Sequence, residues 1–259
     1  MSEDLSGRVA VVTGAAKGIG KATAEAFADR GAAVALVDLD DAEGEKAAAS
    51  IEETGGKAFF IKANVADFAE TERAAGEAAS SFGRIDFLVN NAGIQRYGSV
   101  VDTAEEVWNE VIDTNLKSVY LMSKHCVPHM RENGGGAIVN VSSVQGLVSQ
   151  RGVAAYSASK GGSIALTRAM AVDFAPDIRV NCVCPGSVDT PMLREAAELF
   201  ADHPEEAVQQ WGGIHPMGRV ARPEEIAQAI VFLASPQSSF VTGAYLLVDG
   251  GLLSVLGGT

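Results

Sequence analysis

The stretch TGAAKGIG, Thr13–Gly20, joins an apolar run at Arg8–Gly14 to a segment of helical periodicity. A tight turn at this junction needs Gly14, and Gly18 and Gly20 let backbone approach a diphosphate and let the helix pack on the strand. The helix N-terminus adds N–H donors and a positive dipole end. The glycine spacing differs from GxGxxG, so a plain tight turn is an alternative. Its position directly after the first strand favours a dinucleotide phosphate site.

The rest of the chain alternates apolar, strand-like runs with longer helical segments. Strands that are apolar throughout are typical of a parallel sheet covered on both faces. We therefore predict an α/β fold in which residues 1–259 form a single Rossmann-type, doubly wound domain, with a seven-stranded parallel sheet and helices on both faces. The predicted strands are Arg8–Gly14, Ala32–Asp38, Lys57–Val65, Arg84–Gly93, Gly136–Ser143, Ile178–Gly186 and Ala244–Gly251.

Helical periodicity is clearest in one long segment, from about Ala104 to Arg131, where Thr103 and Glu106 have the spacing of a capping box. The segment from Met192 to Gln210 also has helical character, with an interruption. Further helices are predicted at Gly18–Arg30, Ala42–Glu53, Val153–Phe174 and after Arg222, with Asp67 as an N-cap and Pro223 in a first turn.

Composition sets limits on function. Hydrophobic residues make up 47% of the chain and charged residues 20%, which is typical of a globular protein, and the net charge of −13 argues against binding to nucleic acid or an anionic membrane. No apolar run approaches the ~18 residues that span a bilayer. Neither a signal peptide nor a disulfide framework is evident, so a cytoplasmic protein is expected. Cys182 and Cys184 are expected to be buried on one face of a strand.

Asp38 ends the second predicted strand, where a carboxylate can hydrogen-bond an adenosine ribose and repel a 2′-phosphate. Lys17 favours NADP instead, since a cation in the glycine loop can bind that phosphate. A surface acid beside Asp40 and Asp41 is the alternative for Asp38 alone. Together with the loop, Asp38 favours NAD over NADP.

Tyr156 and Lys160, in YSASK, are four residues apart and share one face of a predicted helix. A free phenol has a pKa of about 10 and a free amine one of about 10.4. An ammonium within ~4–6 Å lowers the pKa of a phenol and brings it towards working pH. The pair is therefore a candidate general acid/base.

Four motifs occur in order: TGAAKGIG, NNAG at Asn90–Gly93, YSASK, and PGSVDT at Pro185–Thr190. In this order and spacing the chain resembles the short-chain dehydrogenase/reductase family over essentially its whole length. The family commonly has Asp-Val after the third strand, where this chain has Asn64-Val65. The resemblance implies a homotetramer or homodimer and these dinucleotide-binding residues: Gly14, Lys17, Gly18, Ile19, Gly20, Asp38, Asn64, Val65, Asn91, Ala92, Gly93, Tyr156, Lys160, Pro185, Gly186, Val188 and Thr190.

The resemblance also implies a catalytic group of Asn115, Ser143, Tyr156 and Lys160. Ser143 ends the fifth predicted strand. Its neighbour Ser142 is the competing choice, and adjacent strand residues point to opposite faces. In the family, Asn115 acts through water on Lys160. Buried Asn and Ser side chains more often satisfy backbone groups, which is the alternative for each taken alone.

Substrate contacts are predicted in loops that follow the strands, because such loops carry specificity in this fold. Gln95, Gln145 and Gln150 suggest a hydroxyl-rich ligand, and satisfaction of loop backbone is the alternative. The segment near 190–215 resembles the substrate lid of the family, in which Leu193, His203 and Trp211 are placed to face a ligand. No metal site is expected. His125 and His129 have i, i+4 spacing, but a structural role is favoured.

The predicted function is NAD-dependent interconversion of a secondary alcohol, polyol or sugar and its carbonyl compound, with Tyr156 as general acid/base. A 3-oxoacyl-thioester reductase that uses NADPH is the enzymatic alternative. A non-catalytic dinucleotide-binding regulator is an alternative of a different class, because fold alone does not prove activity.

Overall fold

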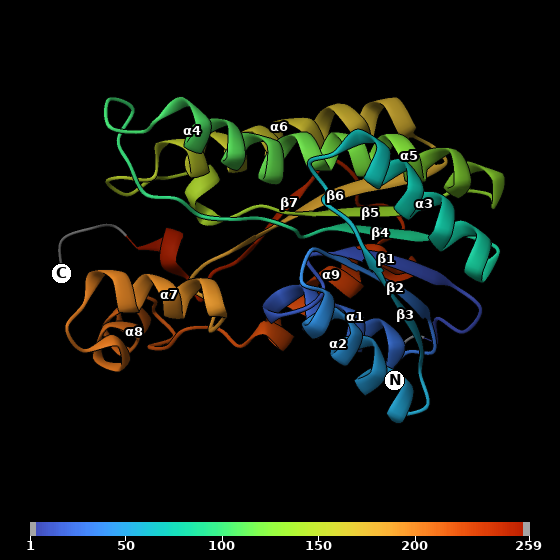
Figure 1. Ribbon diagram of the computed structural model, residues 1–259, viewed down its shortest axis with the longest axis horizontal. Helices are drawn as coiled ribbons and strands as arrows, with labels where there is room; N and C mark the ends of the chain where they lie inside the picture. Colours follow the sequence, from blue (N-terminus) through green and yellow to red (C-terminus); the bar gives the residue numbers. More distant parts are fainter. Residues whose placement is uncertain (1–3, 256–259) are drawn as a thin grey trace.

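The computed structural model describes residues 4–255. Its centre is a seven-stranded parallel sheet with strand order β3-β2-β1-β4-β5-β6-β7, so the predicted fold class is confirmed (Figure 1). The strands are β1 (Val9–Thr13), β2 (Ala33–Asp38), β3 (Lys57–Lys62), β4 (Phe87–Asn90), β5 (Gly136–Val141), β6 (Ile178–Pro185) and β7 (Tyr245–Val248).

Helices cover both faces of this sheet. They are α1 (Gly18–Ala28), α2 (Asp41–Glu53), α3 (Phe68–Phe82), α4 (Glu105–Ile112), α5 (Ser118–Glu132), α6 (Ala154–Phe174), α7 (Pro191–Phe200), α8 (Pro204–Gly213) and α9 (Pro223–Ala234), with short turns η1 (Asp113–Lys117), η2 (Val144–Gly146), η3 (Pro236–Ser238) and η4 (Leu252–Ser254).

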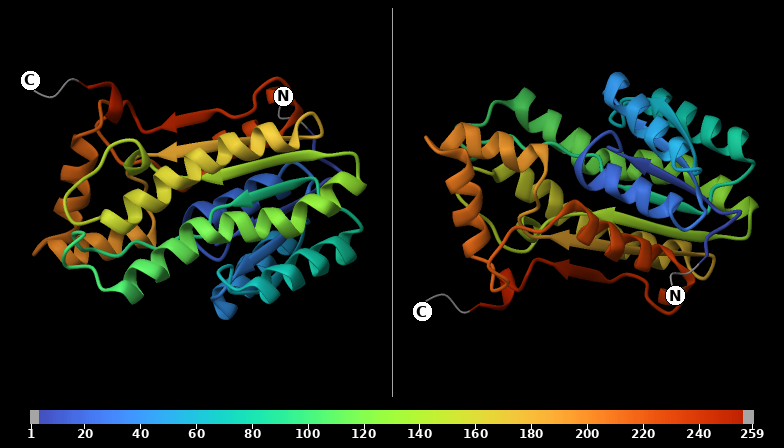
Figure 2. Two further views of the ribbon diagram at one scale, coloured as in Figure 1. Left: turned by 90° about the horizontal axis from the view of Figure 1, so that it is seen from above. Right: turned by 90° about the horizontal axis from the view of Figure 1, so that it is seen from below.

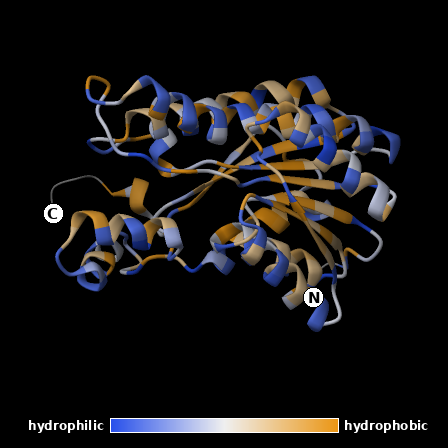
Figure 3. Ribbon diagram, in the orientation of Figure 1, coloured by the Kyte–Doolittle hydropathy of each residue, from blue (hydrophilic) through white to orange (hydrophobic). Residues whose placement is uncertain are grey.

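Side-chain alternation along the strands separates two cores. In β1, Ala10 and Val12 pack with α1, α2 and α9, whereas Val11 packs on the opposite face with α3, α5 and α6. A strand buried on both faces must be apolar at every position, which explains the continuous apolar runs in the sequence. Figure 3 shows these apolar strands between helices that carry hydrophilic residues on their outer faces.

The strand order reverses at β1, which pairs with β2 on one side and β4 on the other. The connections leaving β1 and β4 therefore diverge and open a crevice at the carboxyl ends of the strands. All seven strands are parallel, so the loops that follow them meet at this same edge. This edge is where a ligand site is expected.

The long helix predicted from Ala104 to Arg131 is broken by a π-helical turn, η1. One extra residue in the turn moves the following side chains around the helix, and such turns are frequent at functional sites. Asn115 lies inside it. The predicted capping box is wrong: Ala104 is the N-cap without a side-chain bond, and the Thr103 hydroxyl donates to the carbonyl of Ser99.

Helices α7 and α8 interrupt the alternation of strands and helices between β6 and α9. They form a small cluster of their own, built on Ala197, Ala207 and Val208. Figure 2 shows both helices, in orange, beyond the carboxyl ends of the strands. They lie within the segment near 190–215 that was predicted to be a substrate lid, and the lid role stays a prediction.

All three cysteines are buried free thiols, as the sequence indicated for Cys182 and Cys184. Within residues 4–255, no helix has the length and apolar character needed to cross a membrane.

Candidate active site

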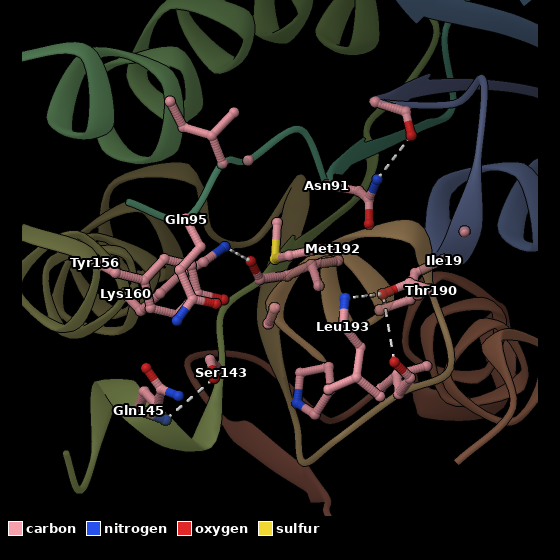
Figure 4. A pocket seen from close by; sticks show the side chains of 18 of the residues that line it. Ile19, Asn91, Gln95, Ser143, Gln145, Tyr156, Lys160, Thr190, Met192 and Leu193 are labelled. Carbon is pink, nitrogen blue, oxygen red and sulfur yellow. Dashed lines mark hydrogen bonds between the residues drawn. The ribbon is translucent and has the colours of Figure 1, made fainter. Parts of the chain in front are cut away.

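A cavity of about 730 Å³ opens at the carboxyl ends of the strands. One part is lined by the loop after β1 and the ends of β2 and β3, and the other by the loops after β4 and β5 and by α7 and α8. In Figure 4, Asn91, Ile19 and Thr190 lie on one side of this pocket and Tyr156, Lys160, Ser143 and Gln145 on the other. It is lined by nearly all of the predicted site residues; Gly20, Asn115 and His203 lie outside its lining.

The loop after β1 has the shape of an anion cradle. Gly14 and Gly18 have φ of +63° and +55°, a region that favours glycine. A Cβ on Gly14 would lie 2.8 Å from the Cα of Ala92, and one on Gly20 would overlap the carbonyl of Gly14. Gly20 therefore acts in helix packing. Helix α1 begins at Gly18 with no side-chain cap from Lys17, so its first N–H groups face the cavity and suit a diphosphate.

Asn91, in NNAG, holds the glycine loop to the end of β4. Its amide nitrogen donates to the carbonyls of Thr13 at 2.9 Å and Gly14 at 3.0 Å. Its backbone N–H donates in turn to the Thr13 hydroxyl at 3.0 Å. Asn91 also lines the cavity, and its predicted contact with the dinucleotide stays a prediction. The glycine loop and NNAG, which are far apart in the sequence, are thus joined into one wall of the cavity.

The carboxylate of Asp38 is oriented by backbone. Its oxygens accept from the N–H groups of Ala16 and Asp40, each at 3.0 Å. The ammonium of Lys17 lies 2.7 Å from the carboxylate of Asp40, and this pairing raises the pKa of Lys17. Lys17, which in the sequence favoured a 2′-phosphate, therefore has an acidic partner. The sequence pattern did not reveal this pairing. Asn64 uses its side-chain oxygen to accept from Ala66 N–H, and it lines the cavity.

Tyr156 and Lys160 lie on one face of α6, both buried. The Lys160 ammonium is 5.5 Å from the centre of the Tyr156 ring and donates to the carbonyl of Val141 at 2.9 Å. Burial lowers the pKa of Lys160 to about 8. Burial also raises the pKa of Tyr156 to about 12, although a hydrogen bond with Ser143 acts in the opposite direction. In the protein without ligand, desolvation therefore exceeds the pKa-lowering effect that the sequence suggested for Lys160.

The two serines at the end of β5 have different partners. Ser142 donates its hydroxyl to the carbonyl of Lys160 at 2.8 Å, which ties β5 to α6. Ser143 interacts with the phenol of Tyr156, and its hydroxyl oxygen accepts from the N–H of Gln145 at 3.1 Å. The choice of Ser143 over Ser142 as the partner of Tyr156 agrees with this geometry.

Asn115 lies behind the cavity wall, where its amide pairs with the backbone of Ile94 in the loop after β4. Its oxygen accepts from the Ile94 N–H and its nitrogen donates to the Ile94 carbonyl, both at 2.8 Å. The nitrogen also donates to the hydroxyl of Ser159 at 3.1 Å. These contacts hold the loop after NNAG against α6. The proton relay to Lys160 that the resemblance implies stays a prediction.

Many of the residues that line the cavity near Tyr156 are apolar. The hydroxyl-rich ligand that the glutamines suggest stays a prediction. Tyr97 and Phe200 meet edge to face, with ring centres 4.5 Å apart, and so join the loop after β4 to α7. Sequence reasoning missed this pair because neither aromatic lies in a periodic pattern. The apolar wall also includes Ile94, Met192, Leu193, Trp211, Ile214 and Leu252.

The predicted substrate residues differ in exposure. Gln95 and Gln145 are half-buried in the lining and Gln150 is exposed at its edge. Leu193 and Trp211 line the cavity as predicted. The prediction for His203 is wrong, because this side chain is exposed at the start of α8 and lies outside the lining.

Another histidine, His215, lies directly behind the PGSVDT loop. It is 3% exposed, and its Nε2 accepts from the N–H of Ser187 at 3.2 Å. Its Nδ1 bonds the carbonyl of Trp211 at 2.9 Å. A Cβ on Gly186 would approach Nε2 to 2.8 Å, so this glycine allows the close contact. No local pattern in the sequence marked His215, because its partner Ser187 comes from another segment, 28 residues away.

A family model described as enoyl-(acyl carrier protein) reductase matches residues 14–253. The chain belongs to the short-chain dehydrogenase/reductase family. Members of this family bind a nicotinamide dinucleotide, and the glycine cradle and uncapped start of α1 fit the diphosphate of such a cofactor. The protein is accordingly an oxidoreductase of the short-chain dehydrogenase/reductase type.

Several members of this family are similar to the chain over nearly its full length. The cis-4-hydroxycyclohexanecarboxylate dehydrogenase of Sinomonas cyclohexanicum is 45% identical, over 98% of this chain and 100% of its own. The 3-oxoacyl-[acyl-carrier-protein] reductase of Thermotoga maritima is 42% identical, over 96% and 99%. The ligand-free aldohexose dehydrogenase of Thermoplasma acidophilum superposes with a TM-score of 0.91 at 38% identity, covering 99% and 97%.

Proposed function

We propose that this protein is an NAD-dependent dehydrogenase that interconverts a cyclic secondary alcohol and its ketone. The observation that carries the proposal is the position of Tyr156, Ser143 and Lys160 at a cavity whose neighbouring wall is apolar. An apolar wall suits a hydrocarbon ring and gives a polyol or sugar few partners for its hydroxyls. The similarity to a hydroxycyclohexanecarboxylate dehydrogenase supports a hydroxyl on a six-membered carbon ring as the reacting group.

In this proposal the reacting hydroxyl lies between the Tyr156 phenol and the Ser143 hydroxyl. During oxidation Tyr156 accepts the hydroxyl proton as general base, while Ser143 hydrogen-bonds the oxygen that becomes the carbonyl. A nicotinamide held in this cavity would supply the acceptor for the hydride that leaves the carbinol carbon. Lys160 keeps a positive charge near the phenol and so favours its ionised form. In reduction Tyr156 returns the proton, which suits the neutral phenol that burial favours.

Two features near the end of β2 favour NAD over NADP: the carboxylate of Asp38 and the pairing of Lys17 with Asp40. Asp38 is held by two backbone N–H groups, so its charge stays at the end of β2, where the family places the adenosine ribose. A 2′-phosphate at this position would be repelled by the Asp38 carboxylate. Lys17, the cation of the glycine loop, is already paired with Asp40. This arrangement supports NAD rather than NADP. Ile19, Val65, Pro185, Val188 and Thr190 line the same cavity and complete the proposed dinucleotide site.

The test is a steady-state assay of the purified protein with NAD and NADP. Cyclohexanol and cyclopentanol should be oxidised with NAD, whereas sorbitol, glucose and a 3-oxoacyl thioester with NADPH should react more slowly. Tyr156→Phe should lower kcat by about 10²–10⁴-fold and keep dinucleotide binding, because it removes only the proton-transfer group. Turnover restricted to the thioester would establish the reductase alternative, and dinucleotide binding without any turnover would establish the regulator.

A homodimer or homotetramer stays part of the proposal. Sedimentation of the purified protein measures the state directly.

A further inference from the structure

The side-chain amide of Gln145 lacks a hydrogen-bond partner for its oxygen among the residues that the structure describes. Its Oε1 is buried and makes no hydrogen bond within residues 4–255. A buried amide oxygen without a partner costs about 1–3 kcal/mol, so native proteins nearly always satisfy it. The side chain lines the cavity, and a rotation of its terminal amide turns Oε1 towards that space, where a bound molecule can supply the missing donor.

The position of Gln145 is fixed relative to the catalytic group. Its N–H donates to the Ser143 hydroxyl at 3.1 Å and begins the short turn η2. The next residue, Gly146, packs so closely on α6 that a Cβ there would lie 2.8 Å from the carbonyl carbon of Lys160. The turn therefore holds Gln145 at a constant place beside Ser143 and α6, on one side of the pocket (Figure 4).

The charges around the cavity disfavour an anionic substrate. Among the described residues that line it, the only cations are Lys17, paired with Asp40, and Lys160, bound to the Val141 carbonyl. The nearby lid residue Arg194 is held by Asp189 and Glu205. A carboxylate in the apolar part would thus be buried without a counter-ion, which is costly.

We infer that the substrate is an uncharged ring alcohol that carries a second hydroxyl, and that Gln145 binds this second hydroxyl through Oε1. The inference rests on the proposed function and adds a specificity to it: neutral diols are preferred over simple cyclic alcohols and over hydroxy acids. A site built to hydrogen-bond a hydroxyl discriminates against analogues that lack it, because its own polar group is then left unpaired.

The test compares kcat/KM with NAD for cyclohexanol, the two isomers of 1,4-cyclohexanediol and 4-hydroxycyclohexanecarboxylate. The wild-type protein should prefer one diol isomer over cyclohexanol by about tenfold, after correction for its two hydroxyls, as one well-made hydrogen bond to a buried group allows. Gln145→Leu should bring this ratio close to one. Gln145→Lys should raise the ratio of carboxylate to diol, since it adds the missing cation.

The matched control is Gln237→Leu, an exposed glutamine outside the cavity, which should keep the wild-type ratios. Equal use of diol and cyclohexanol by the wild-type protein, an unchanged ratio in Gln145→Leu, or the carboxylate as the best substrate would each overturn the inference and leave the proposed function standing. No oxidation of any ring alcohol would overturn both.

Discussion

His215 and Ser187 are joined by a hydrogen bond of 3.2 Å that connects the end of the lid to the loop after β6. Because Nε2 of His215 accepts this bond, the ring proton lies on Nδ1, which donates to Trp211 at the end of α8. One imidazole therefore positions both the PGSVDT loop and the lid. Trp211 is four residues before His215, but Ser187 is 28 residues before it, so the connection to the PGSVDT loop exists only in the folded chain.

His215→Ala should weaken this connection. We expect the free energy of unfolding to fall by about 2–4 kcal/mol, because a buried side chain is lost and the Ser187 N–H is left unpaired. The KM for NAD should rise more than kcat falls, because the loop that lines the dinucleotide site loses its support. Urea denaturation and steady-state kinetics measure both effects. His203→Ala, at the exposed histidine of α8, is the control; an equal effect there would contradict the assignment.

Cofactor choice should depend on Asp38 and Asp40 in different ways. Asp38→Ala removes the charge that opposes a 2′-phosphate and should shift the kcat/KM ratio of NADP to NAD upward by about ten- to a hundredfold, since like charges at ~4 Å repel by ~1–4 kcal/mol. Asp40→Ala frees Lys17 and should add to this shift. Asp41→Ala, whose partner is Lys62, is the control. A ratio unchanged by Asp38→Ala would refute the proposed cofactor site.

Lys160 should destabilise the fold at neutral pH. Its pKa falls from the ordinary 10.5 to about 8 on burial, so the unfolded chain binds more protons between these values and stability rises with pH across that window. At pH 7 the burial cost is fully present and corresponds to about 3 kcal/mol. The hydrogen bond from Lys160 to the Val141 carbonyl offsets about 1–2 kcal/mol of this burial cost, and a substitution that removes Lys160 also loses this bond.

Lys160→Met should therefore lose activity and yet gain about 1–2 kcal/mol in the free energy of unfolding at pH 7. This gain should disappear towards pH 10.5. Urea denaturation at several pH values measures the difference, and Lys124→Met, at an exposed lysine of α5, serves as control. A mutant less stable than wild type at pH 7 would contradict the desolvation argument.

Asn115 should be important for stability as well as for turnover. Asn115→Ala leaves the N–H and carbonyl of Ile94 without their partner, and the free energy of unfolding should fall by about 2–4 kcal/mol. Asn133→Ala, which removes a bond to the end of α5, should cost less because Asn133 is only partly buried. If Asn115→Ala kept full stability while kcat fell, a proton relay would explain it better than positioning.

The sequence permitted prediction of the sheet, its layers and most of the cavity lining. Continuous apolar runs identified the strands and so placed Asp38 and Ser143 at strand ends, and two of the four motifs contained Gly14 and Tyr156. The break at η1 was missed, because the periodicity on either side of a π turn is helical. His203 was misplaced, because lid packing, rather than sequence spacing, decides which side chains face the cavity.

By itself the sequence determined the parallel sheet and the set of residues that meet at its carboxyl edge, because apolar periodicity and motif spacing act through local backbone geometry. Only the tertiary structure decided which partner each polar group has: Lys17 binds Asp40, Asn115 pairs with Ile94, His215 supports Ser187, and Oε1 of Gln145 has no partner within residues 4–255. These pairings join distant segments, and their geometry depends on how whole elements pack rather than on any neighbouring residue.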